Sequence, residues 1–553
     1  MALLHGGRGE NGRDLAPLNG LVSALMTDMY QITMTYAYWK AGRHEENAVF
    51  DLFFRKCPFK GQFTVFAGLS EAISLVNSFS FSPEDIAYLR TVLPRCEEAF
   101  FAWLGELDCR NVRLYTLPEG TLCFPRIPLI RVEGPLAITQ LLETPLLNLI
   151  NFPSLVATKA ARMRVAAGSD KVLLEFGLRR AQGPDGALSA SRYSYVGGFD
   201  ATSNVLAGKL IGIQIRGTHA HSFVQSYTSF DQIKDPTLDG EDFVAKVKDY
   251  RDRLGCSQSS SESELAAFTA FAQAFPDAFL ALLDTYDTLA SGVPNFLCVA
   301  LALDDLGHRA LGCRIDSGDL RYFSQEVRRM VTEASKTFER PFLATTNIVA
   351  SSDINEETLH SLSDQEHAID TFGIGTNLVT CQSQPALGCV YKLVSIEGMP
   401  RMKLSEITSK ITIPAKKWAY RLVGGDGVPI LDIMLKDGEE PPKPGVPTLA
   451  RHEITPRGKR RAHPFVATKR AMVTASKVVP LHQLVWDGQH GGVTSDLPTI
   501  DEVRATVAQE LLQVRPDILQ RLNPTPYKVS VSEKLYDFLH SLWEKEAPIR
   551  ELR

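Results

Sequence analysis

Apolar runs and helical segments alternate through the middle of the chain. A helix is expected over 155–162, with Ser154 as its N-cap, and the apolar run 172–176 after it has the length of a buried strand. The run 300–307 is expected to be a strand end followed by a surface loop. Further strand-like and helical segments follow in alternation at 310–315, 320–334, 341–350, 353–359 and 368–372. This repeated order predicts parallel strands joined by crossover helices, and thus an α/β fold.

Polar residues and glycines stand directly after these expected strands, where parallel α/β folds place their ligand sites. In segment 314–319, Arg314 and two carboxylates could meet a phosphate and either sugar hydroxyls or Mg²⁺, and a structural salt bridge is the competing interpretation. The glycine-rich segment 372–377 is a candidate phosphate cradle or a tight turn. The chain has no G-x-x-x-x-G-K-[ST] loop, so a Walker-type nucleotide site is not indicated.

Two histidines follow a strand-like segment at 211–215. His219 and His221 are two residues apart, so on a strand both imidazoles would face one side, but no third metal ligand is apparent nearby. A nucleophilic or acid-base histidine is therefore the better chemical interpretation. Packing or hydrogen bonding inside the fold is the alternative.

The composition is that of a large folded protein. The 553 residues predict three to four domains at roughly 150 residues each, or fewer if one of them is a barrel. Hydrophobic residues make up 44% and charged residues 22%, which excludes wholesale disorder and a coiled coil. The 59 Lys and Arg stand against 64 Asp and Glu, a net charge of -5, so the chain lacks the basic excess of a dedicated nucleic-acid binder. Any bound anion must be held by local cations.

The cysteines and the N-terminal region indicate a cytosolic protein. Nine cysteines without a C-x-x-C pair fit reduced thiols, buried as small apolar side chains, better than a disulfide framework or a zinc site. Residues 1–20 resemble neither a secretory nor a mitochondrial signal, so a flexible leader is expected. The longest apolar runs fall well short of the ~20 residues that span a bilayer. We expect no membrane or nucleic-acid partner.

Two polar segments are expected to be surface insertions or linkers. Residues 257–264 are rich in serine and glutamate, and residues 437–447 carry proline, glycine and acidic residues that cannot build a core. A basic cluster at 457–461 follows the second segment. Because the whole chain is acidic, a solvated face is the better interpretation of this cluster than a nucleic-acid patch.

The most specific signal is a series of short motifs in a fixed order. They are 27–31, 53–56, 66–69, 175–180, 198–204, 217–221, 284–287, 314–319 and 372–376, with a further motif at 523–527. In this order they resemble the nicotinate phosphoribosyltransferase family. The resemblance covers roughly residues 20 to 420. Such ordered coverage is far more specific than any single motif.

The resemblance implies a fold and a reaction. The fold would be that of a type II phosphoribosyltransferase, with an irregular parallel α/β barrel at 151–400 and a second α/β domain built from 21–150 and 401–553. The molecule would be a homodimer with shared active sites. The implied reaction is the ATP-coupled transfer of phosphoribosyl from 5-phosphoribosyl 1-diphosphate to nicotinate. It gives nicotinate mononucleotide and diphosphate, the first step of NAD synthesis from nicotinic acid, and is classed as a ligase reaction.

The resemblance also implies which residues meet the base. Phe176 and Tyr30 of the partner subunit would stack on opposite faces of the pyridine ring, while Arg179 and Arg314 would meet anionic groups. Ser203 stands where the nicotinamide-using relatives have an aspartate. A carboxylate there would accept from an amide but repel the carboxylate of nicotinate, so Ser203 favours the acid.

The remaining implied roles concern phosphates, sugar and metal. Asp284 and Asp316 would address ribose hydroxyls or a Mg²⁺ or Mn²⁺ ion whose ligands stay unassigned, and Gly375 with Thr376 would cradle the 5′-phosphate. His221 matches the histidine that ATP phosphorylates in the family. With Asp316 and Arg314, it completes the expected catalytic set.

One departure from the family pattern and two rival functions remain. The family usually has Pro-Gly before a basic pair, whereas this chain has Ala415 before two lysines, which puts the geometry of that anion-binding loop in question. A nicotinamide-specific enzyme of the same fold is one rival, in which Asp200 could supply the missing carboxylate. An inactive binding homologue is the other rival, against which the retained His221, Arg314 and Asp316 argue.

Overall fold

A computed structural model of the chain describes residues 19–404, 410–451 and 470–546. The fold divides into two compact units. Unit 1 combines both chain ends, up to Lys159 and from Ser383, and unit 2 runs from Ala160 to Gln382. Most of the expected leader and all of the basic cluster 457–461 lie outside the described residues. The expected boundaries at 20, 150 and 400 stay predictions.

Unit 1 contains a seven-stranded antiparallel sheet, in the order β15-β14-β1-β5-β3-β21-β22. Its strands are β1 (Asn47–Phe54), β3 (Arg113–Thr116), β5 (Ile130–Pro135), β14 (Cys389–Ile396), β15 (Met399–Pro400), β21 (Gln483–Asp487) and β22 (Gly492–Val493). Strand β1 is buried on both faces after Asn47 because its sequence, NAVFDLFF, is almost wholly apolar. The strand thereby lies inside the sheet, between β14 and β5.

A second sheet of unit 1 has the order β19-β18-β23-β17-β16-β20. Its strands are β16 (Lys417–Val423), β17 (Pro429–Lys436), β18 (Pro447–Arg451), β19 (Arg470–Thr474), β20 (Lys477–Pro480) and β23 (Val529–Val531). Alternate apolar residues of β16 and β17, including Leu422, Leu431 and Ile433, form its buried cluster. The polar segment 437–447 connects β17 to β18, and its residues are mostly exposed.

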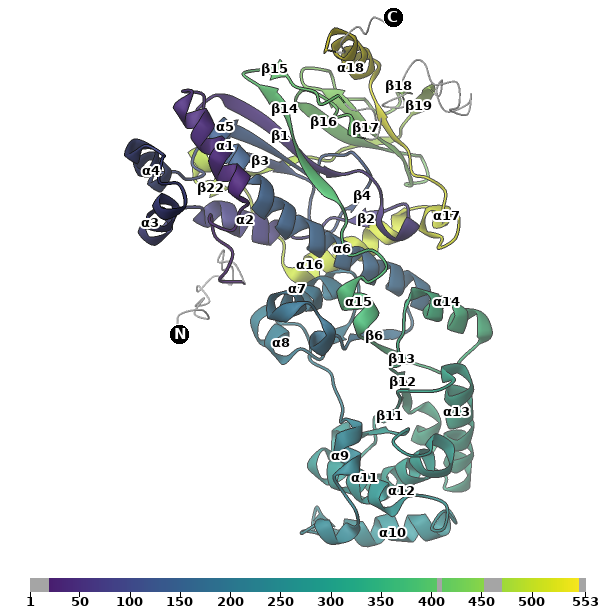
Figure 1. Cartoon of the computed structure of the whole chain (residues 1–553). Helices are drawn as coiled ribbons and strands as arrows, with labels where there is room; N and C mark the ends of the chain where they lie inside the picture. Colours follow the sequence, from purple (N-terminus) through teal and green to yellow (C-terminus); the bar gives the residue numbers. More distant parts are fainter. Residues whose placement is uncertain (1–18, 405–409, 452–469, 547–553) are drawn as a thin grey trace, which may run out of the picture. The chain divides into compact units, whose positions relative to one another are not determined.

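Unit 1 also contains helices, of which α5 and α18 pack on its sheets. They are α1 (Met29–Lys40), α2 (Leu69–Ser78), α3 (Pro83–Val92), α4 (Glu98–Gly105), α5 (Leu136–Leu141), α16 (Ile500–Gln513), α17 (Pro516–Leu519) and α18 (Glu533–Glu546), and α6 (Glu143–Ala167) begins here. Figure 1 shows α5 beside β1, with α1 packed on α5. Ser154 was expected to cap a helix, but α6 begins eleven residues earlier, at Glu143. The Ser154 hydroxyl instead donates to the Ala67 carbonyl (3.1 Å) and accepts from the Ala67 amide (3.0 Å).

Unit 2 is built on a six-stranded sheet in the order β10-β11-β12-β13-β6-β7, and every neighbouring pair is parallel. The strands are β6 (Val172–Glu175), β7 (Ala201–Thr202), β10 (Leu280–Leu282), β11 (Gly312–Ile315), β12 (Asn347–Ala350) and β13 (Thr371–Ile374). Together with a second unit from both chain ends, this sheet confirms the predicted α/β fold with parallel strands.

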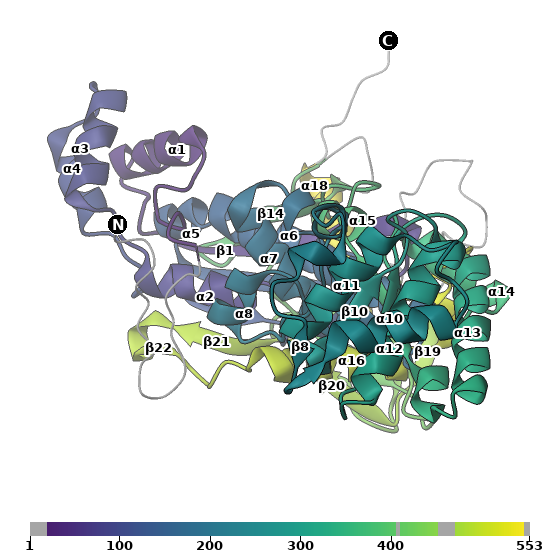
Figure 2. The ribbon, with the colours of Figure 1, turned by 90° about the horizontal axis from the view of Figure 1, so that it is seen from below.

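Helices join the parallel strands of unit 2. They are α7 (Gly183–Val196), α8 (Val205–Ile211), α9 (His221–Gln225), α10 (Phe243–Arg253), α11 (Glu262–Ala274), α12 (Val293–Asp304), α13 (Leu320–Thr337), α14 (Glu356–Gln365) and α15 (Thr376–Thr380). Figure 2 shows α10, α12 and α13 side by side in this unit. In the part of the chain that the structure describes, none of the helices combines the length and apolar character that a membrane span requires.

Three further local expectations were wrong, each for a physical reason. Most of the run 300–307 belongs to α12, which is buried all round from Asn295 to Leu303, and such a helix has the same apolar pattern as a buried strand. The segment 211–215 is no strand, because Gly212 ends α8 with a φ of 86° and only Ile215 forms a β-bridge, to Thr202.

The third wrong expectation concerns the serine-rich segment 257–264. Ser257 to Ser259 are exposed, but Ser260 and Glu264 are buried, and Ser261 caps the start of α11. The Glu264 carboxylate accepts hydrogen bonds from the Ser291 hydroxyl (2.6 Å) and the Asn295 amide (2.9 Å). Low-complexity composition concealed a segment whose polar groups bond to the protein interior.

Ala415 retains the backbone geometry that a glycine would give at this position. Its φ is 68°, in the left-handed region, and its amide donates to the Val394 carbonyl (2.9 Å). The two lysines after it are paired within unit 1, Lys416 with Glu133 (3.0 Å) and Lys417, in a fully buried pair, with Asp51. The loop therefore keeps its shape, while its lysines are neutralised by neighbouring carboxylates.

We predict that Ala415→Gly stabilises the protein. A left-handed conformation costs an L-residue about 1 to 2 kcal/mol, and the greater chain entropy of unfolded glycine offsets roughly half of that gain. The free energy of unfolding should rise by about 0.5 kcal/mol, measured by urea denaturation. The matched control is Ala102→Gly, at an exposed position of α4. It should lower the free energy of unfolding by about 1 kcal/mol. Equal losses in both variants would contradict strain at Ala415.

Candidate active site at the carboxyl ends of the parallel strands

The predicted site residues of unit 2 gather at one edge of its sheet. Those within two residues of the carboxyl end of a strand are Phe176 after β6, Ser203 after β7, Asp284 after β10, Arg314 in β11, Asp316 after β11 and Gly375 after β13. Because the strands are parallel neighbours, their carboxyl ends lie along the same edge. This is the edge where parallel α/β folds bind ligands.

His221 is the centre of a polar cluster at this edge. It is the first residue of α9, and its Nδ1 lies 3.1 Å from the Thr285 hydroxyl. Its Nε2 lies 3.7 Å from Asp316 Oδ2 and 4.0 Å from Asp284 Oδ1. With carboxylates on the Nε2 side and a hydroxyl on the Nδ1 side, the ring is held in one orientation. The imidazole is partly exposed, so a reactant can reach it.

Two serines hold the carboxylates that face His221. The Ser317 hydroxyl donates to Asp284 Oδ2 (2.5 Å), and the Ser351 hydroxyl donates to Asp316 Oδ1 (2.6 Å). Asp284 Oδ1 is buried and has no hydrogen-bond partner in the described part of the chain. The two carboxylates therefore keep oxygen atoms available for a ligand.

Arg314 is a largely buried cation beside these carboxylates. Its Nη1 donates to the Thr218 hydroxyl (2.9 Å), whereas its Nε is buried without a hydrogen-bond partner among the described residues. Burial lowers the pKa of Arg314, and the neighbouring Arg179 cation lowers it further. The carboxylates of Asp316 and Asp284 act in the opposite direction and raise this pKa. Two guanidinium groups in mutual electrostatic contact form a natural site for an anion.

Phe176 lies against the glycine-rich turn after β13. A Cβ on Gly373 would stand 2.5 Å from the Phe176 ring, and a Cβ on Gly375 would stand 3.2 Å from the Phe176 carbonyl oxygen. The close approach of the half-buried Phe176 ring therefore favours a glycine at 373, while the contact at Gly375 is tight. Gly375 directly precedes the first residue of α15, Thr376.

Sequence reasoning missed the buried carboxylate that supports this turn. Glu175 ends β6, and its Oε2 accepts hydrogen bonds from the hydroxyls of Thr202 (2.6 Å) and Ser191 (2.8 Å). Its Oε1 accepts from the Gly177 amide. Glu175 was part of the motif 175–180, but a charged residue at the end of an apolar run gave no sign of its partners on β7 and α7. Its role is to fix the segment that carries Phe176 and Arg179.

His219 makes no hydrogen bond to the cluster around His221 among the described residues, and Tyr30 belongs to unit 1. His219 is buried among Phe223, Phe268 and Phe271, and burial lowers its pKa to about 4, so the ring stays neutral. Its Nε2 accepts from the Leu282 amide (3.3 Å), which makes His219 a packing residue. Tyr30 is an exposed residue of α1 in unit 1, outside the unit that holds the other predicted site residues.

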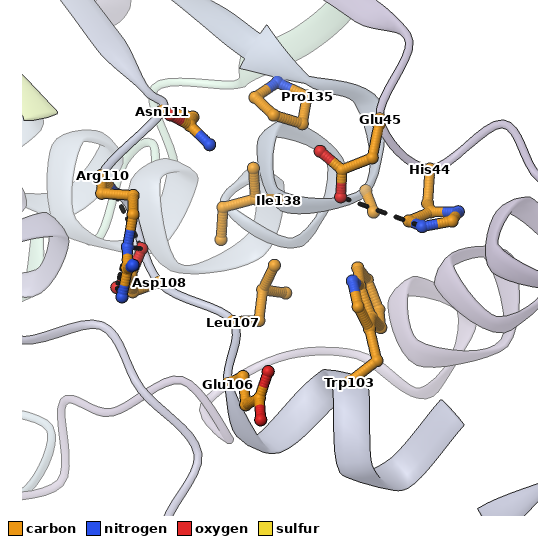
Figure 3. A pocket seen from close by; sticks show the side chains of 11 residues that line it. His44, Glu45, Trp103, Glu106, Leu107, Asp108, Arg110, Asn111, Pro135 and Ile138 are labelled. Atoms are coloured by element: carbon orange, nitrogen blue, oxygen red, sulfur yellow. Dashed lines mark hydrogen bonds and ion pairs between the residues drawn. The ribbon is translucent and has the colours of Figure 1, made fainter. Parts of the chain in front are cut away.

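A separate cavity of about 190 Å³ lies in unit 1. Figure 3 shows Trp103 on one side of it, with His44, Glu45, Glu106 and Ile138 around the opening. His44 meets the Trp103 ring edge-on, at 5.1 Å between ring centroids. None of the predicted site residues lines this cavity, so it is distinct from the cluster around His221.

Known proteins resemble this chain over nearly its whole length. Residues 25–151 match the family described as the nicotinate phosphoribosyltransferase N-terminal domain, and residues 416–539 match its C-terminal domain. Nicotinate phosphoribosyltransferase 2 of Arabidopsis thaliana is 52% identical over 98% of this chain and 99% of its own length. The Homo sapiens nicotinate phosphoribosyltransferase is 46% identical over 95% and 97%.

The chain belongs to the nicotinate phosphoribosyltransferase family. The crystal structure of the human nicotinic acid phosphoribosyltransferase agrees, with a TM-score of 0.83 and 43% identity over 93% of this chain and 99% of that one. A nicotinate-nucleotide pyrophosphorylase from Pyrococcus furiosus shares the fold, with a TM-score of 0.57 at 19% identity over 89% of this chain and 95% of that one. The resemblance to the nicotinate phosphoribosyltransferase family that the ordered motifs indicated is thereby confirmed.

The contact between Phe176 and Gly373 gives a prediction about stability. Gly373→Ala forces the new methyl group into the Phe176 ring, and overpacking of this kind costs about 1 to 3 kcal/mol in the free energy of unfolding. The measurement is urea denaturation of the full chain. The control, Gly186→Ala in α7, meets only Gln182 at 3.8 Å and should be neutral or stabilising. A Gly373→Ala protein as stable as the control would contradict the described packing.

Proposed function

We propose that this protein transfers phosphoribosyl from 5-phosphoribosyl 1-diphosphate to nicotinate, with ATP as a co-substrate, and releases nicotinate mononucleotide and diphosphate. The observation that carries the proposal is His221 between Thr285, Asp284 and Asp316, beside Arg314, in a chain of this family. Relatives over nearly the whole chain bear the name of this reaction. The cluster offers a nucleophilic ring nitrogen, carboxylates for sugar or metal, and cations for phosphate.

The base would bind on the Phe176 ring. Its carboxylate would meet Arg179 and Arg314, whose unpartnered Nε needs a hydrogen-bond acceptor. Ser203, half-buried after β7, presents a hydroxyl to the bound base and no negative charge. A buried cation without an anion beside it costs several kcal/mol, and the neutral amide would leave Arg314 in that state, so this arrangement favours nicotinate over its amide.

ATP would phosphorylate His221. The carboxylates on the Nε2 side favour the tautomer with the proton on Nε2, so Nδ1 accepts from the Thr285 hydroxyl (3.1 Å) until the γ-phosphate of ATP displaces that hydroxyl. The Nδ1 lone pair would then attack the γ-phosphorus, the bond from this phosphorus to the bridging oxygen would break, and ADP would leave. The resulting phosphohistidine adds negative charge close to Arg314 and so orders this edge of the sheet for the second substrate.

The residues present fit a hard divalent cation such as Mg²⁺ or Mn²⁺. Asp284 and Asp316 offer carboxylate oxygens, one of them buried without a hydrogen-bond partner within the described ranges. No group of three or more acidic, His or Cys ligands occurs among the described residues. Mg²⁺ needs no such cage, because it binds through one or two carboxylates together with substrate phosphates and water. When bound, it would neutralise charge on the diphosphate.

The sugar phosphate and the second subunit complete the proposal. Gly375 and Thr376 would cradle the 5′-phosphate with their backbone amides at the turn after β13.

Tyr30, which is exposed on α1 beside the likewise exposed Met29, would close the base site of the partner subunit in a homodimer. The proposed location of this reaction is the cytosol.

The nicotinamide-specific alternative loses its candidate carboxylate. Asp200 precedes β7, whereas Ser203 follows that strand, so the two residues belong to opposite ends of it. Asp200 Oδ2 also accepts hydrogen bonds from Arg164 (2.6 Å) and from the Leu173 amide (2.8 Å). Asp200 is thus held by its own structural partners. This favours the acid as the substrate, and the intact cluster around His221 disfavours an inactive homologue.

The choice of base can be tested by product analysis. Incubation with 5-phosphoribosyl 1-diphosphate, ATP and Mg²⁺ should convert nicotinate at least ~100-fold more efficiently than nicotinamide. Ser203→Asp should lower kcat/KM for nicotinate by charge repulsion, whereas Ser203→Asn, which has the same size and no charge, should lower it less. Comparable turnover of both bases by the unaltered protein would refute the proposed specificity.

The role of His221 can be tested with [γ-³²P]ATP. The protein should take up label that is lost in acid and stable in base, as a phosphohistidine is, and His221→Ala should abolish both the label and the stimulation by ATP. The matched control is His308→Ala, because His308 is paired with Asp239 and Asp277 in the same unit, away from the cluster. A folded His221→Ala protein that still responds to ATP would rule out the phosphohistidine.

A further inference from the structure

Two thiols in unit 2 lie in contact outside the proposed catalytic cluster. Cys256 follows α10 at the start of the serine-rich segment, and Cys298 lies in the middle of α12. Their sulfur atoms are 4.0 Å apart, although 42 residues separate them in sequence. Cys298 has no exposed surface, whereas Cys256 is 5% exposed and borders the exposed residues Ser257 to Ser259. A small oxidant can therefore approach Cys256 first.

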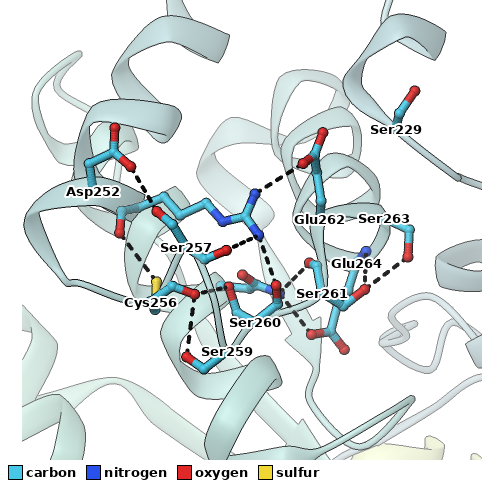
Figure 4. A network of polar contacts seen from close by, with 12 residues as sticks. Ser229, Asp252, Cys256, Ser257, Ser259, Ser260, Ser261, Glu262, Ser263 and Glu264 are labelled. Carbon is cyan, nitrogen blue, oxygen red and sulfur yellow. Dashed lines mark hydrogen bonds and ion pairs between the residues drawn. The ribbon is translucent and has the colours of Figure 1, made fainter.

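Polar groups surround Cys256, and the segment 257–264 that follows it consists of serine, glutamine and glutamate residues. Figure 4 shows the network, in which the hydroxyls of Ser259 and Ser260 donate to the Cys256 carbonyl and Ser257 bonds to Asp252. The Arg251 guanidinium donates to the carbonyls of Ser257 (3.3 Å) and Ser260 (2.8 Å). The hydrogen bond from the Cys298 thiol, with the Ser260 hydroxyl and the Arg251 cation, lowers the pKa of Cys256 below the usual thiol range.

We propose that Cys256 and Cys298 are an oxidative modification site and form a reversible disulfide. The Cys256 thiolate attacks one oxygen of hydrogen peroxide, the O–O bond breaks, and Cys256 becomes a sulfenic acid. The Cys298 sulfur then attacks Cys256, the S–O bond breaks, and water leaves as the S–S bond forms. In sum, two thiols and one peroxide give one disulfide and two waters. A dithiol reductant restores both thiols.

The geometry indicates which part of unit 2 moves when the disulfide forms. The sulfur atoms must approach from 4.0 Å to a bond length of about 2 Å. Helix α12 is buried all round, so the serine-rich segment is the part that moves. That segment is joined to the start of α12 at Ser261, whose amide donates to Ser291 (2.9 Å) and whose carbonyl accepts from Asn295 (2.9 Å).

A consequence for activity rests on the proposed function. Ser291 and Asn295 follow the turn 284–287, which supplies Thr285 and Asp284 to His221. The Asp287 side chain accepts from the amides of Leu289 (3.0 Å) and Ala290 (2.7 Å) and so connects that turn to the helical segment before α12. A shift of Ser261 would therefore disturb the partners of His221. We expect the disulfide to lower the ATP-dependent rate several-fold.

The experiment is disulfide mapping of the full-length protein, with no substrate present. The protein is treated with excess hydrogen peroxide, free thiols are blocked, and peptides are compared by mass spectrometry with and without dithiothreitol. We expect a linked pair of peptides containing Cys256 and Cys298, lighter by two hydrogen atoms than the reduced pair and split by dithiothreitol. Cys256→Ser and Cys298→Ala should each abolish it, and the control Cys96→Ser, a half-buried thiol of unit 1, should not.

Each result decides the proposal. The linked peptide, its loss in both variants and its reversal by dithiothreitol support it. Peroxide treatment that leaves both thiols free, oxidises Cys256 only to sulfinic acid, or joins either cysteine to another partner would overturn it. The unaltered protein carries the decisive signal, so poor folding of Cys298→Ala does not decide the outcome. The rate with ATP is measured separately on the oxidised, unaltered protein, and an unchanged rate beside a formed disulfide would overturn only the effect on activity.

Discussion

The candidate site depends on the parallel hydrogen-bond register of unit 2. Neighbours β10 and β11 pair Leu282 with Arg314, so the chain leaves both strands at nearly the same level. Asp284 and Asp316 each lie two residues beyond that paired level, and this equivalence lets them face the same imidazole at 4.0 and 3.7 Å. A slip of one residue would turn alternate side chains to the other face and separate them. The chemistry therefore rests on backbone pairing rather than on contacts among the site residues.

The site holds charge that the protein satisfies only in part. Removing Arg314 and Asp284 from water is costly, and Thr218 and Ser317 offset that cost with one hydrogen bond each. Arg314 Nε and Asp284 Oδ1 keep no hydrogen-bond partner within the described residues. Glu175, by contrast, accepts bonds on both oxygens from its own unit. Glu175 is therefore a structural carboxylate, whereas Arg314 and Asp284 can still form hydrogen bonds with a ligand.

Much of unit 2 could be predicted from the sequence, since short apolar runs followed by polar turns define both the strands and the strand ends. That logic found Arg314, Asp316 and Gly375 without a structure. It selected His221 but placed it after a strand, whereas the apolar run before it ends a helix and turns at Gly212. It also failed for α12, whose burial on all sides removes the periodicity that distinguishes helix from strand. Partners such as Thr285 and Ser351 depend on tertiary contacts, and local pattern carries no information about them.

The two family-domain matches and the proposed chemistry fall on different parts of this chain. The two family matches, 25–151 and 416–539, both fall within unit 1, whose framework includes fully buried pairs such as Lys417 with Asp51. His221 and its partners all lie in unit 2, between those matches. A buried ion pair tolerates little change because the loss of one partner leaves an uncompensated charge. Hence the family matches alone would locate the framework, and relatives aligned over nearly the whole chain are needed to include the site.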